Sequence, residues 1–464
     1  SNAINELFAD DSGNLWIGTE NDGLNKFNIN TGKVKVYKNE IGNNKSINSS
    51  SVWSIYEDDE GRIWIGSYNK GISVIDTNYS KFESYQSNPY STISLPYNDV
   101  RGFCETNNSK IWIATDGGGI CRFNFKTRSF DKVVRSNEKH KSISNNSILS
   151  IISDSDDNIW IGSWGGGVDR LTQNGTLIKN YKIESKTGVG NNKINTLYQD
   201  KRGNIWAGTN GSGLHIYNKS MDQFDTFVYK DMLNERSYVS SIQTYSDNTF
   251  WIGTLTGLIF LELDQHQNVV HAKRFTTSNS SISSNSIHTL LIDDNNKIWL
   301  GTYNGGANVL NPHDESFRIF SKKDGLSSNN ISGILQDDKG NIWISTNAGI
   351  SRIDIKTSEI TIYTTEDGLN SNEFYSKSCL KVKNGALLFG SEKGFNLIHP
   401  EQIKTNPHIP NILLTGLRIN NIPVDITTKS SPLNKQLSES DTLILNYKQT
   451  SFSIDFVALN YTRP

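Results

Sequence analysis

The chain has 464 residues, of which 35% are hydrophobic and 10% aromatic, so it can bury the cores of roughly two to four ordinary domains. Its 46 basic and 48 acidic residues give a net charge of −2, which argues against a chain built to bind nucleic acid, and no apolar run reaches the roughly 18 residues of a membrane span. The three cysteines are too few, and odd in number, for a disulfide framework.

The first three residues, Ser-Asn-Ala, resemble the scar of a cleaved tag and are set aside. From residue 4 onward one unit recurs at intervals of 44 to 48 residues, centred on an aromatic residue that follows a hydrophobic one. Eight copies carry Trp and the ninth carries Phe, at positions Trp16, Trp64, Trp112, Trp160, Trp206, Trp251, Trp299, Trp343 and Phe389. The nearly fixed interval indicates one structural unit repeated along the chain.

Each unit is predicted to form four short β-strands. Residues 52–86 illustrate the pattern, because turn segments rich in Asp, Asn and Gly separate runs at 52–56, 62–66, 72–76 and 81–86. A unit of this size cannot bury both of its faces alone, and radial stacking against its neighbours solves that problem. The sequence therefore predicts an all-β chain, a β-propeller of four-stranded blades followed by a partial β-sandwich domain.

An Asp-x-Gly-x-x-Trp element runs from Asp11 to Trp16 and again from Asp59 to Trp64. It resembles the Asp-box of sialidase-type propellers, which is a folding device in a hairpin, with the Trp packed between blades. We therefore expect the repeat aromatic residues and these Asp residues to be structural.

The last repeat lacks a fourth strand, because its pattern stops after residues 394–398. We expect the strand at 81–86 to fill that gap and close seven blades into a ring over residues 81–400. Residues 4–80 are then two blades of an upstream propeller, 401–411 a linker, and 412–464 a truncated β-sandwich domain with strands near 412–419, 443–447 and 451–458. A single ring of eight or nine blades is the alternative.

One rim of the propeller varies between repeats and is the candidate ligand site. The turn between the second and third strands and the start of the first strand share this rim, whereas the opposite rim repeats Asp, Gly and Asn. Aromatic rings suit stacking on sugar faces, Arg and His suit a carboxylate or sulfate, and Asn suits hydroxyls. The candidates are Arg101, Asp116, Trp164, Asn195, Asn210, His288, Tyr303 and Tyr375. Packing between blades, or solvation of the rim, is the alternative for each.

The sequence indicates neither catalytic nor cofactor chemistry. The eight His have no Cys or carboxylate partners at metal-ligand spacing, so neither a metal nor a cofactor is expected. The Gly-rich turns at 116–119 and 164–167 join two predicted strands, so they are hairpin turns rather than phosphate-binding loops. Cys104 and Cys121 fall on strands that another strand separates, and we expect free thiols there.

Two stretches carry a family resemblance. The unit Asn-x-Ile/Val…Asp-x-x-Gly-x-Ile-Trp-Ile-Gly-Thr…Gly-Gly-Leu resembles the two-component-regulator propeller repeat. Residues 447–461, Tyr-Lys-Gln-Thr-Ser-Phe-Ser-Ile-Asp-Phe-Val-Ala-Leu-Asn-Tyr, resemble the opening of the triple-tyrosine domain that follows such propellers. Together they resemble the periplasmic sensor region of Bacteroides-type hybrid two-component systems, with most of the first propeller, the rest of the triple-tyrosine domain and everything downstream outside this chain.

The resemblance implies a periplasmic ligand-sensing region that binds glycan-derived oligosaccharides and signals across the membrane to a histidine kinase controlling polysaccharide-utilisation genes. It implies a homodimer in the full-length protein, membrane contact only through downstream segments, and neither nucleic-acid binding nor enzyme activity in this part. Two other functions stay open from the residues: a polysaccharide lyase or glycosidase on a propeller scaffold, and a protein-interaction scaffold.

Overall fold

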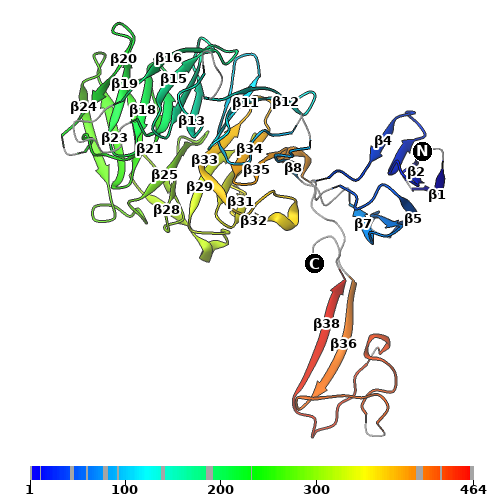
Figure 1. The fold of residues 1–464 in the computed structure, drawn as a ribbon. Coiled ribbons are helices and arrows are strands. Elements are labelled where there is room, and N and C mark those ends of the chain that lie inside the picture. The colour runs from blue at the N-terminus through cyan, green and yellow to red at the C-terminus, as the bar shows by residue number, and fades with distance from the viewer. Residues whose placement is uncertain are drawn as a thin grey trace. The chain divides into compact units, whose positions relative to one another are not determined.

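The computed structural model describes most of the chain, namely residues 3–10, 12–41, 46–58, 61–76, 82–90, 94–136, 142–183, 192–230, 232–403, 411–428, 431–440 and 442–459. Regular structure in these residues is almost entirely β-strand (Figure 1). Four short 3₁₀ helices interrupt it, at Lys322–Asp324 (η1), Thr365–Asp367 (η2), Pro400–Gln402 (η3) and Leu437–Glu439 (η4). Within the described ranges, none of the helices has the length and apolar character needed to cross a bilayer.

The chain divides into two compact units. The larger comprises Glu40–Lys45 and Ser80–Ile403, and the smaller comprises Ser1–Asn39, Ser46–Tyr79 and Lys404–Pro464. Both are built from antiparallel sheets in which consecutive strands lie side by side. This arrangement follows from the short turns between the strands, because two- to five-residue loops can join only antiparallel neighbours.

The described residues of the larger unit form seven four-stranded sheets. Six of them take four consecutive strands each. The first three contain β9 (Val100–Glu105), β10 (Ile111–Thr115), β11 (Gly119–Asn124) and β12 (Ser129–Val134); β13 (Ile148–Ser153), β14 (Ile159–Ser163), β15 (Gly167–Leu171) and β16 (Leu177–Tyr181); and β17 (Ile194–Gln199), β18 (Ile205–Thr209), β19 (Leu214–Asn218) and β20 (Gln223–Phe227).

The next three contain β21 (Val239–Thr244), β22 (Thr249–Thr254), β23 (Gly257–Leu263) and β24 (Val269–Phe275); β25 (Ile287–Ile292), β26 (Ile298–Thr302), β27 (Ala307–Leu310) and β28 (Phe317–Phe320); and β29 (Ile331–Gln336), β30 (Ile342–Thr346), β31 (Gly349–Ile353) and β32 (Ile360–Tyr363). The first strands of neighbouring sheets pack side by side, and β33 (Phe374–Lys381) of the seventh sheet lies beside β9 of the first. The sheets therefore form a ring, and the predicted all-β propeller fold is confirmed (Figure 1).

The seventh sheet joins distant parts of the chain. Its strands are β33, β34 (Leu387–Ser391), β35 (Gly394–Ile398) and β8 (Phe82–Tyr85), with β35 paired to β8 from Phe395–Tyr85 to Ile398–Phe82. Gly394 has a φ of 100°, and a Cβ there would lie 1.9 Å from the carbonyl oxygen of Tyr85. Gly349 has the same relation, at 2.4 Å, to Tyr363 in the fourth strand of its own sheet. Tyr85 thus occupies the place that a fourth strand fills elsewhere.

Seven of the repeat tryptophans pack between neighbouring sheets, where each joins a hydrophobic cluster of the next sheet. Trp299, for example, packs with Ile331 and Ile344, and its ring stacks on Phe320 at 5.6 Å. Seven of the eight repeat tryptophans are buried, and Trp64 is partly exposed. Full burial of such large rings is what holds one blade against another, at about 25 cal/mol per Å² of apolar surface removed from water.

The Asp that holds each Trp lies one position earlier than the sequence motif placed it. The indole nitrogen donates to a carboxylate six residues upstream in six repeats, at 2.7–2.9 Å, in the pairs Trp16–Asp10, Trp64–Asp58, Trp160–Asp154, Trp206–Asp200, Trp299–Asp293 and Trp343–Asp337. The same carboxylates accept backbone N–H groups of the hairpin turn, as Asp337 does from Lys339 and Asn341. Asp11 and Asp59 lie outside the described residues.

Two repeats lack this bond. The position six residues upstream is Thr106 for Trp112 and Tyr245 for Trp251. Both indole nitrogens are buried, and neither has a hydrogen-bond partner in the described part of the chain.

The ninth repeat was misaligned by one residue. Phe389 pairs with Cys379 on the neighbouring strand, and Leu388 pairs with Leu380. In the preceding sheet Trp343 pairs with Leu335, and Ile344 with Ile334. Strand β34 begins one residue before Leu388, as β30 begins one residue before Trp343, so Leu388 occupies the Trp position and Phe389 the position of Ile344. Phe389 was predicted to occupy the Trp position of the ninth repeat because it is aromatic, but the strand register places Leu388 there.

The described residues of the smaller unit form three sheets. One consists of β1 (Ile4–Ala9), β2 (Asn14–Thr19), β3 (Leu24–Asn28) and β4 (Val34–Tyr37), and a second of β5 (Val52–Glu57), β6 (Ile63–Ser67) and β7 (Ile72–Ile75). The third belongs to the tail and consists of β37 (Ile422–Pro423), β36 (Asn411–Ile419) and β38 (Phe452–Leu459). The strand expected near 443–447 is irregular, since no described strand lies beside it. The domain boundaries drawn from the sequence stay a prediction.

Candidate functional site

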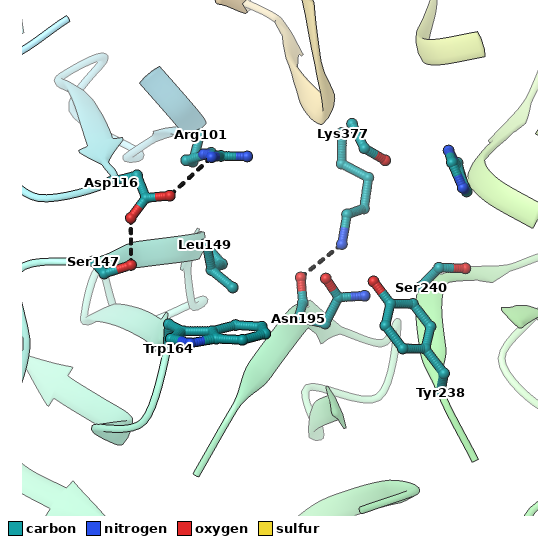
Figure 2. A pocket seen from close by; sticks show the side chains of 11 residues that line it. Arg101, Asp116, Ser147, Leu149, Trp164, Asn195, Tyr238, Ser240 and Lys377 are labelled. Carbon is teal, nitrogen blue, oxygen red and sulfur yellow. Dashed lines mark hydrogen bonds and ion pairs between the residues drawn. The ribbon is translucent and has the colours of Figure 1, made fainter. Parts of the chain in front are cut away.

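A cavity of about 520 Å³ lies where the first strands of the propeller sheets converge. Its lining comes from five of the first strands, β9, β13, β17, β21 and β25, from the start of β33, and from turns beside them. The lining residues are Arg101, Asp116, Ser147, Leu149, Trp164, Asn195, Tyr238, Ser240, His288, Ser376 and Lys377 (Figure 2). Because six of the seven sheets contribute between one and three side chains, the cavity is a property of the ring rather than of any one repeat.

Five of the eight residues proposed from the sequence line this cavity: Arg101, Asp116, Trp164, Asn195 and His288. The other three do not line it, and each contacts a residue that does. The ring of Tyr375 lies 3.6 Å from the Arg101 guanidinium carbon, the ring of Tyr303 lies 5.7 Å from that of His288, and Asn210 forms a β-bridge with Tyr238. A ligand-binding role for each of the eight stays a prediction.

Arg101 and Asp116 form an ion pair at one side of the cavity, with 2.8 Å between nitrogen and oxygen. Asp116 also accepts a short hydrogen bond from the Ser147 hydroxyl, and Figure 2 shows the three groups in a row. Arg101 stacks on Tyr375, whose hydroxyl donates to Asp99. Burial and this hydrogen bond raise the pKa of Tyr375, so its hydroxyl stays protonated. Each charge of the pair is therefore matched within the protein.

Trp164 offers the cavity a flat apolar surface. It sits in the Gly-rich turn between β14 and β15, and 43% of its side chain is exposed. Asn145 donates from Nδ2 to the Trp164 carbonyl oxygen at 2.9 Å, which ties the turn to the neighbouring segment. The Lys193 ammonium lies 4.7 Å from the centre of the indole ring. An exposed, anchored indole of this kind suits stacking against the apolar face of a sugar ring.

Lys377 reaches into the cavity from a bulge in β33. The register of β33 against β34 passes from Phe374–Ser391 directly to Cys379–Phe389, so the strand carries extra residues here. Lys377 has a φ of 63°, in the left-handed region that L-residues rarely adopt. Its ammonium donates to the backbone carbonyl oxygen of Asn195, in another sheet, at 2.6 Å (Figure 2). Burial lowers the pKa of Lys377 to about 7.

His288 faces the same space from β25. Burial, together with the nearby positive charge of Lys377, lowers the pKa of His288 below its usual value, so the ring is neutral at pH 7. Its Nε2 lies 3.5 Å from the Ser286 hydroxyl, at the outer limit of a hydrogen bond. The imidazole is therefore free to donate to, or accept from, a polar group that enters the cavity.

Six lining residues were not among the candidates from the sequence: Ser147, Leu149, Tyr238, Ser240, Ser376 and Lys377. A signal for Lys377 was present: the first and second strands begin 11 positions apart in β29 and β30, at Ile331 and Ile342, but 13 apart in β33 and β34. The two additional residues had to bulge, and a bulge next to a converging set of strands re-aims a side chain. Ser147 and Tyr238 lie just before their strands, so aligning the strands did not reach them.

The described residues contain no cluster of three His, Cys, Asp or Glu side chains arranged to hold a metal ion. Asp116, already paired with Arg101, is the one carboxylate among the described residues that line the cavity. Cys104, Cys121 and Cys379 are free, and burial raises the pKa of each thiol, that of Cys379 to about 12.

Comparison with known proteins identifies the repeat. The family model described as two component regulator propeller matches residues 1–21, 46–69, 94–117, 142–165, 188–211, 281–304 and 325–348. A curated relative, Histidine kinase P4 of Formosa agariphila, is 27% identical over 264 residues, which are 47% of this chain and 19% of that protein. This chain therefore spans about a fifth of the length of the curated relative.

Solved structures share the fold. The extracellular domain of the hybrid two component system BT4673 from B. thetaiotaomicron is 23% identical with a TM-score of 0.58, over 98% of this chain and 60% of that one. A streptogramin B lyase is 14% identical with a TM-score of 0.52, over 69% of this chain and 99% of that one. At these identities the likeness concerns the fold alone. The family model concerns the repeat: seven segments of this chain are similar to the two-component-regulator propeller repeat.

Proposed function

We propose that this chain is the ligand-binding part of the extracytoplasmic sensor of a hybrid two-component system, and that it binds a glycan-derived oligosaccharide in the cavity of the propeller. The observation that carries the proposal is the lining. An exposed indole face stands beside fixed polar groups, namely the Arg101–Asp116 pair, the Asn195 amide and His288. A flat apolar surface next to convergent hydrogen-bonding groups is the usual composition of a sugar site.

The comparisons support the sensor part of this proposal. The repeats match a regulator propeller family, a curated relative is named a histidine kinase, and a solved chain of the same fold is described as the extracellular domain of a hybrid two-component system. By analogy, a kinase in the remainder of the protein reads the state of this region from across the membrane, with the protein as a homodimer, and controls polysaccharide-utilisation genes.

The ring arrangement offers a way for ligand binding to change the relative positions of the blades. The cavity lining belongs to first strands of several sheets, so one ligand contacts several blades at once. A ligand shifts an equilibrium only by its difference in affinity for two arrangements. We infer that the bound state favours one relative position of the blades, which the segments flanking the ring transmit.

Binding of an oligosaccharide library to this chain, measured by thermal shift and then by calorimetry, tests the proposal. Trp164→Ala should weaken any hit by about tenfold or more, because it removes the stacking surface. Trp53→Ala is the matched control, since Trp53 is similarly exposed, at 51%, and lies in the smaller unit outside the cavity. Failure of every oligosaccharide to bind, or equal losses in the two variants, would contradict the proposal. Release of reducing ends or unsaturated products from a hit would instead favour a lyase or glycosidase.

A further inference from the structure

We propose that the oligosaccharide is acidic, and that its carboxylate or sulfate group binds Lys377 while a neighbouring sugar ring stacks on Trp164. This inference rests on the proposed function and narrows its ligand to one chemical class. It starts from the wider bulge of β33. The first strands β9, β13, β17, β21 and β25 each line the cavity with a residue at a one-residue register shift, whereas the register of β33 skips from Phe374 to Cys379 and places Lys377 there.

The bulge that carries Lys377 is held on both sides. Before it, the Tyr375 hydroxyl donates to Asp99, and after it the Ser378 hydroxyl donates to the carbonyl oxygen of Val100 at 2.8 Å. Both partners belong to the segment around β9, the first strand of the adjacent sheet. Between these anchors the backbone of Lys377 adopts its left-handed conformation. Strained backbone persists where the surroundings fix it, and such sites cluster where ligands bind.

The charges of the cavity leave one cation unmatched. The ionisable groups that face Lys377 are Arg101 from β9, Asp116 from the turn after β10, Tyr238 from the segment before β21 and His288 from β25. Arg101 and Asp116 neutralise each other, and His288 and Tyr238 are uncharged at pH 7. In the described part of the chain the Lys377 ammonium contacts a carbonyl oxygen and has no carboxylate within ion-pair distance.

Burying the charged Lys377 ammonium costs free energy as long as no anion is bound beside it. Removing a charge from water without an opposite charge favours the neutral amine, which is the direction in which burial moves the pKa of Lys377. A bound carboxylate or sulfate reverses this effect, because opposite charges a few ångströms apart stabilise the protonated form. The free energy of desolvating the ammonium is already spent in folding, so an anionic ligand gains more here than at an exposed lysine.

The positions of Lys377 and Trp164 also determine which two groups the ligand must carry. Figure 2 shows the Lys377 side chain extended from one side of the cavity and the Trp164 ring on another, with Asn195 between them. A ligand that reaches both must present an anionic group and an apolar ring face together. An acidic sugar next to a second sugar has these features, and uronic acids and sulfated sugars share the chemistry that Lys377 recognises.

The test compares ligands that differ only in charge. A tetragalacturonate is paired with its methyl ester, and a sulfated carrageenan tetrasaccharide, whose sugars carry no carboxylate, is paired with its desulfated form; the binding of each to the whole chain is measured by calorimetry. We expect the charged member of at least one pair to bind at least tenfold more tightly than its neutral counterpart. Which pair responds distinguishes a uronate from a sulfate. Equal affinities within every pair that binds would overturn the inference, whereas no binding by any member would count against the oligosaccharide function itself.

Two lysine variants assign the effect to Lys377. Lys377→Met should reduce the affinity for the charged ligand at least tenfold and leave the neutral one unchanged, while Lys339→Met, in the turn between β29 and β30, should change neither. In the wild type the affinity for the anion should fall as the pH rises from 6 to 8.5, with proton uptake on binding, because the amine is neutral above pH 7. Lys377→Arg should remove this pH dependence, since Arg stays charged. An unchanged affinity in Lys377→Met, or the same pH dependence in Lys377→Arg, would refute the role of Lys377.

Discussion

The Asp–Trp pairs make a quantitative prediction about the stability of the propeller, best tested at Asp337. One carboxylate oxygen, Oδ1, accepts the backbone N–H groups of Lys339 and Asn341, both at 2.9 Å. The other, Oδ2, accepts from the Asn341 side-chain amide and from the Trp343 indole, also at 2.9 Å. Asp337 and Trp343 are 1% and 0% exposed, so water cannot replace these bonds.

Asp337→Asn keeps the shape of the side chain but replaces one of its two acceptor oxygens with an NH₂ donor. Whichever way the new amide lies, its NH₂ group faces two donors, and two buried bonds are lost. Hydrogen bonds to a charged acceptor are worth roughly 1.5–3 kcal/mol each, so we expect the loss of two to lower the free energy of unfolding by about 3–6 kcal/mol. Asp338→Asn is the control: this carboxylate pairs with Lys381 at 2.7 Å but is 71% exposed, and its loss should cost at most about 1 kcal/mol.

Chemical denaturation followed by tryptophan fluorescence measures both variants. The Trp343→Phe background then separates the indole bond from the bonds to the turn, because Asp337→Asn should cost less once the indole donor is gone. If Asp337→Asn and Asp338→Asn unfold within about 1 kcal/mol of each other, the carboxylates are not what fixes the hairpins, and the repeat must be held by ring burial alone.

Three further changes follow from the same contacts. Lys377→Met should raise the free energy of unfolding of the unliganded protein, most below pH 7. The gain should shrink as the pH rises from 7 toward 10.5, because in that range the native amine has lost a proton that the unfolded chain still binds. Denaturation at pH 6 and pH 9 measures the gain, and a gain independent of pH would contradict the reasoning. Gly394→Ala should lower the unfolding midpoint sharply, since its Cβ would meet the Tyr85 carbonyl oxygen, and a midpoint equal to wild type would mean that β8 does not hold this place. Thr106→Asp should add about 1 kcal/mol by giving the Trp112 indole an acceptor, and a double-mutant cycle with Trp112→Phe should abolish the gain.

Much of the fold could be predicted from the sequence because the repeat is read many times. A single Trp in a short strand says little about the fold. The interval of 44 to 48 residues between successive tryptophans, from Trp16 to Trp343, recurs often enough to identify a propeller unit. In the ninth repeat, which has no Trp, the strand register and not aromatic character shows which residue takes the Trp position. That residue is Leu388, one position before the predicted Phe389. The strand expected near 443–447 was predicted from a short apolar run, and the structure describes these residues as irregular.

Part of the cavity lining could be predicted from the sequence. Sequence variation between repeats pointed to the rim at which Trp164 and His288 line the cavity. Lys377 was missed because its position depends on a bulge, and the alignment assumed that every first strand has the same length. Tyr303 and Tyr375 were also proposed from the sequence; they do not line the cavity but contact His288 and Arg101, an arrangement that depends on side-chain direction and not on spacing.

The pairing of β8 with β35 also decides how the propeller carries mechanical force. The chain enters the ring at Phe82 and leaves it at Ile398, and these two residues are direct partners in the sheet. Tension between the upstream and downstream segments therefore acts across this one pair and opens the strands successively, like a zipper, instead of shearing the whole ladder at once. The other six sheets bear none of the load. A pull on the flanking segments would open the ring at its closure before any other blade is disturbed, which makes this junction the mechanically weakest point of the propeller.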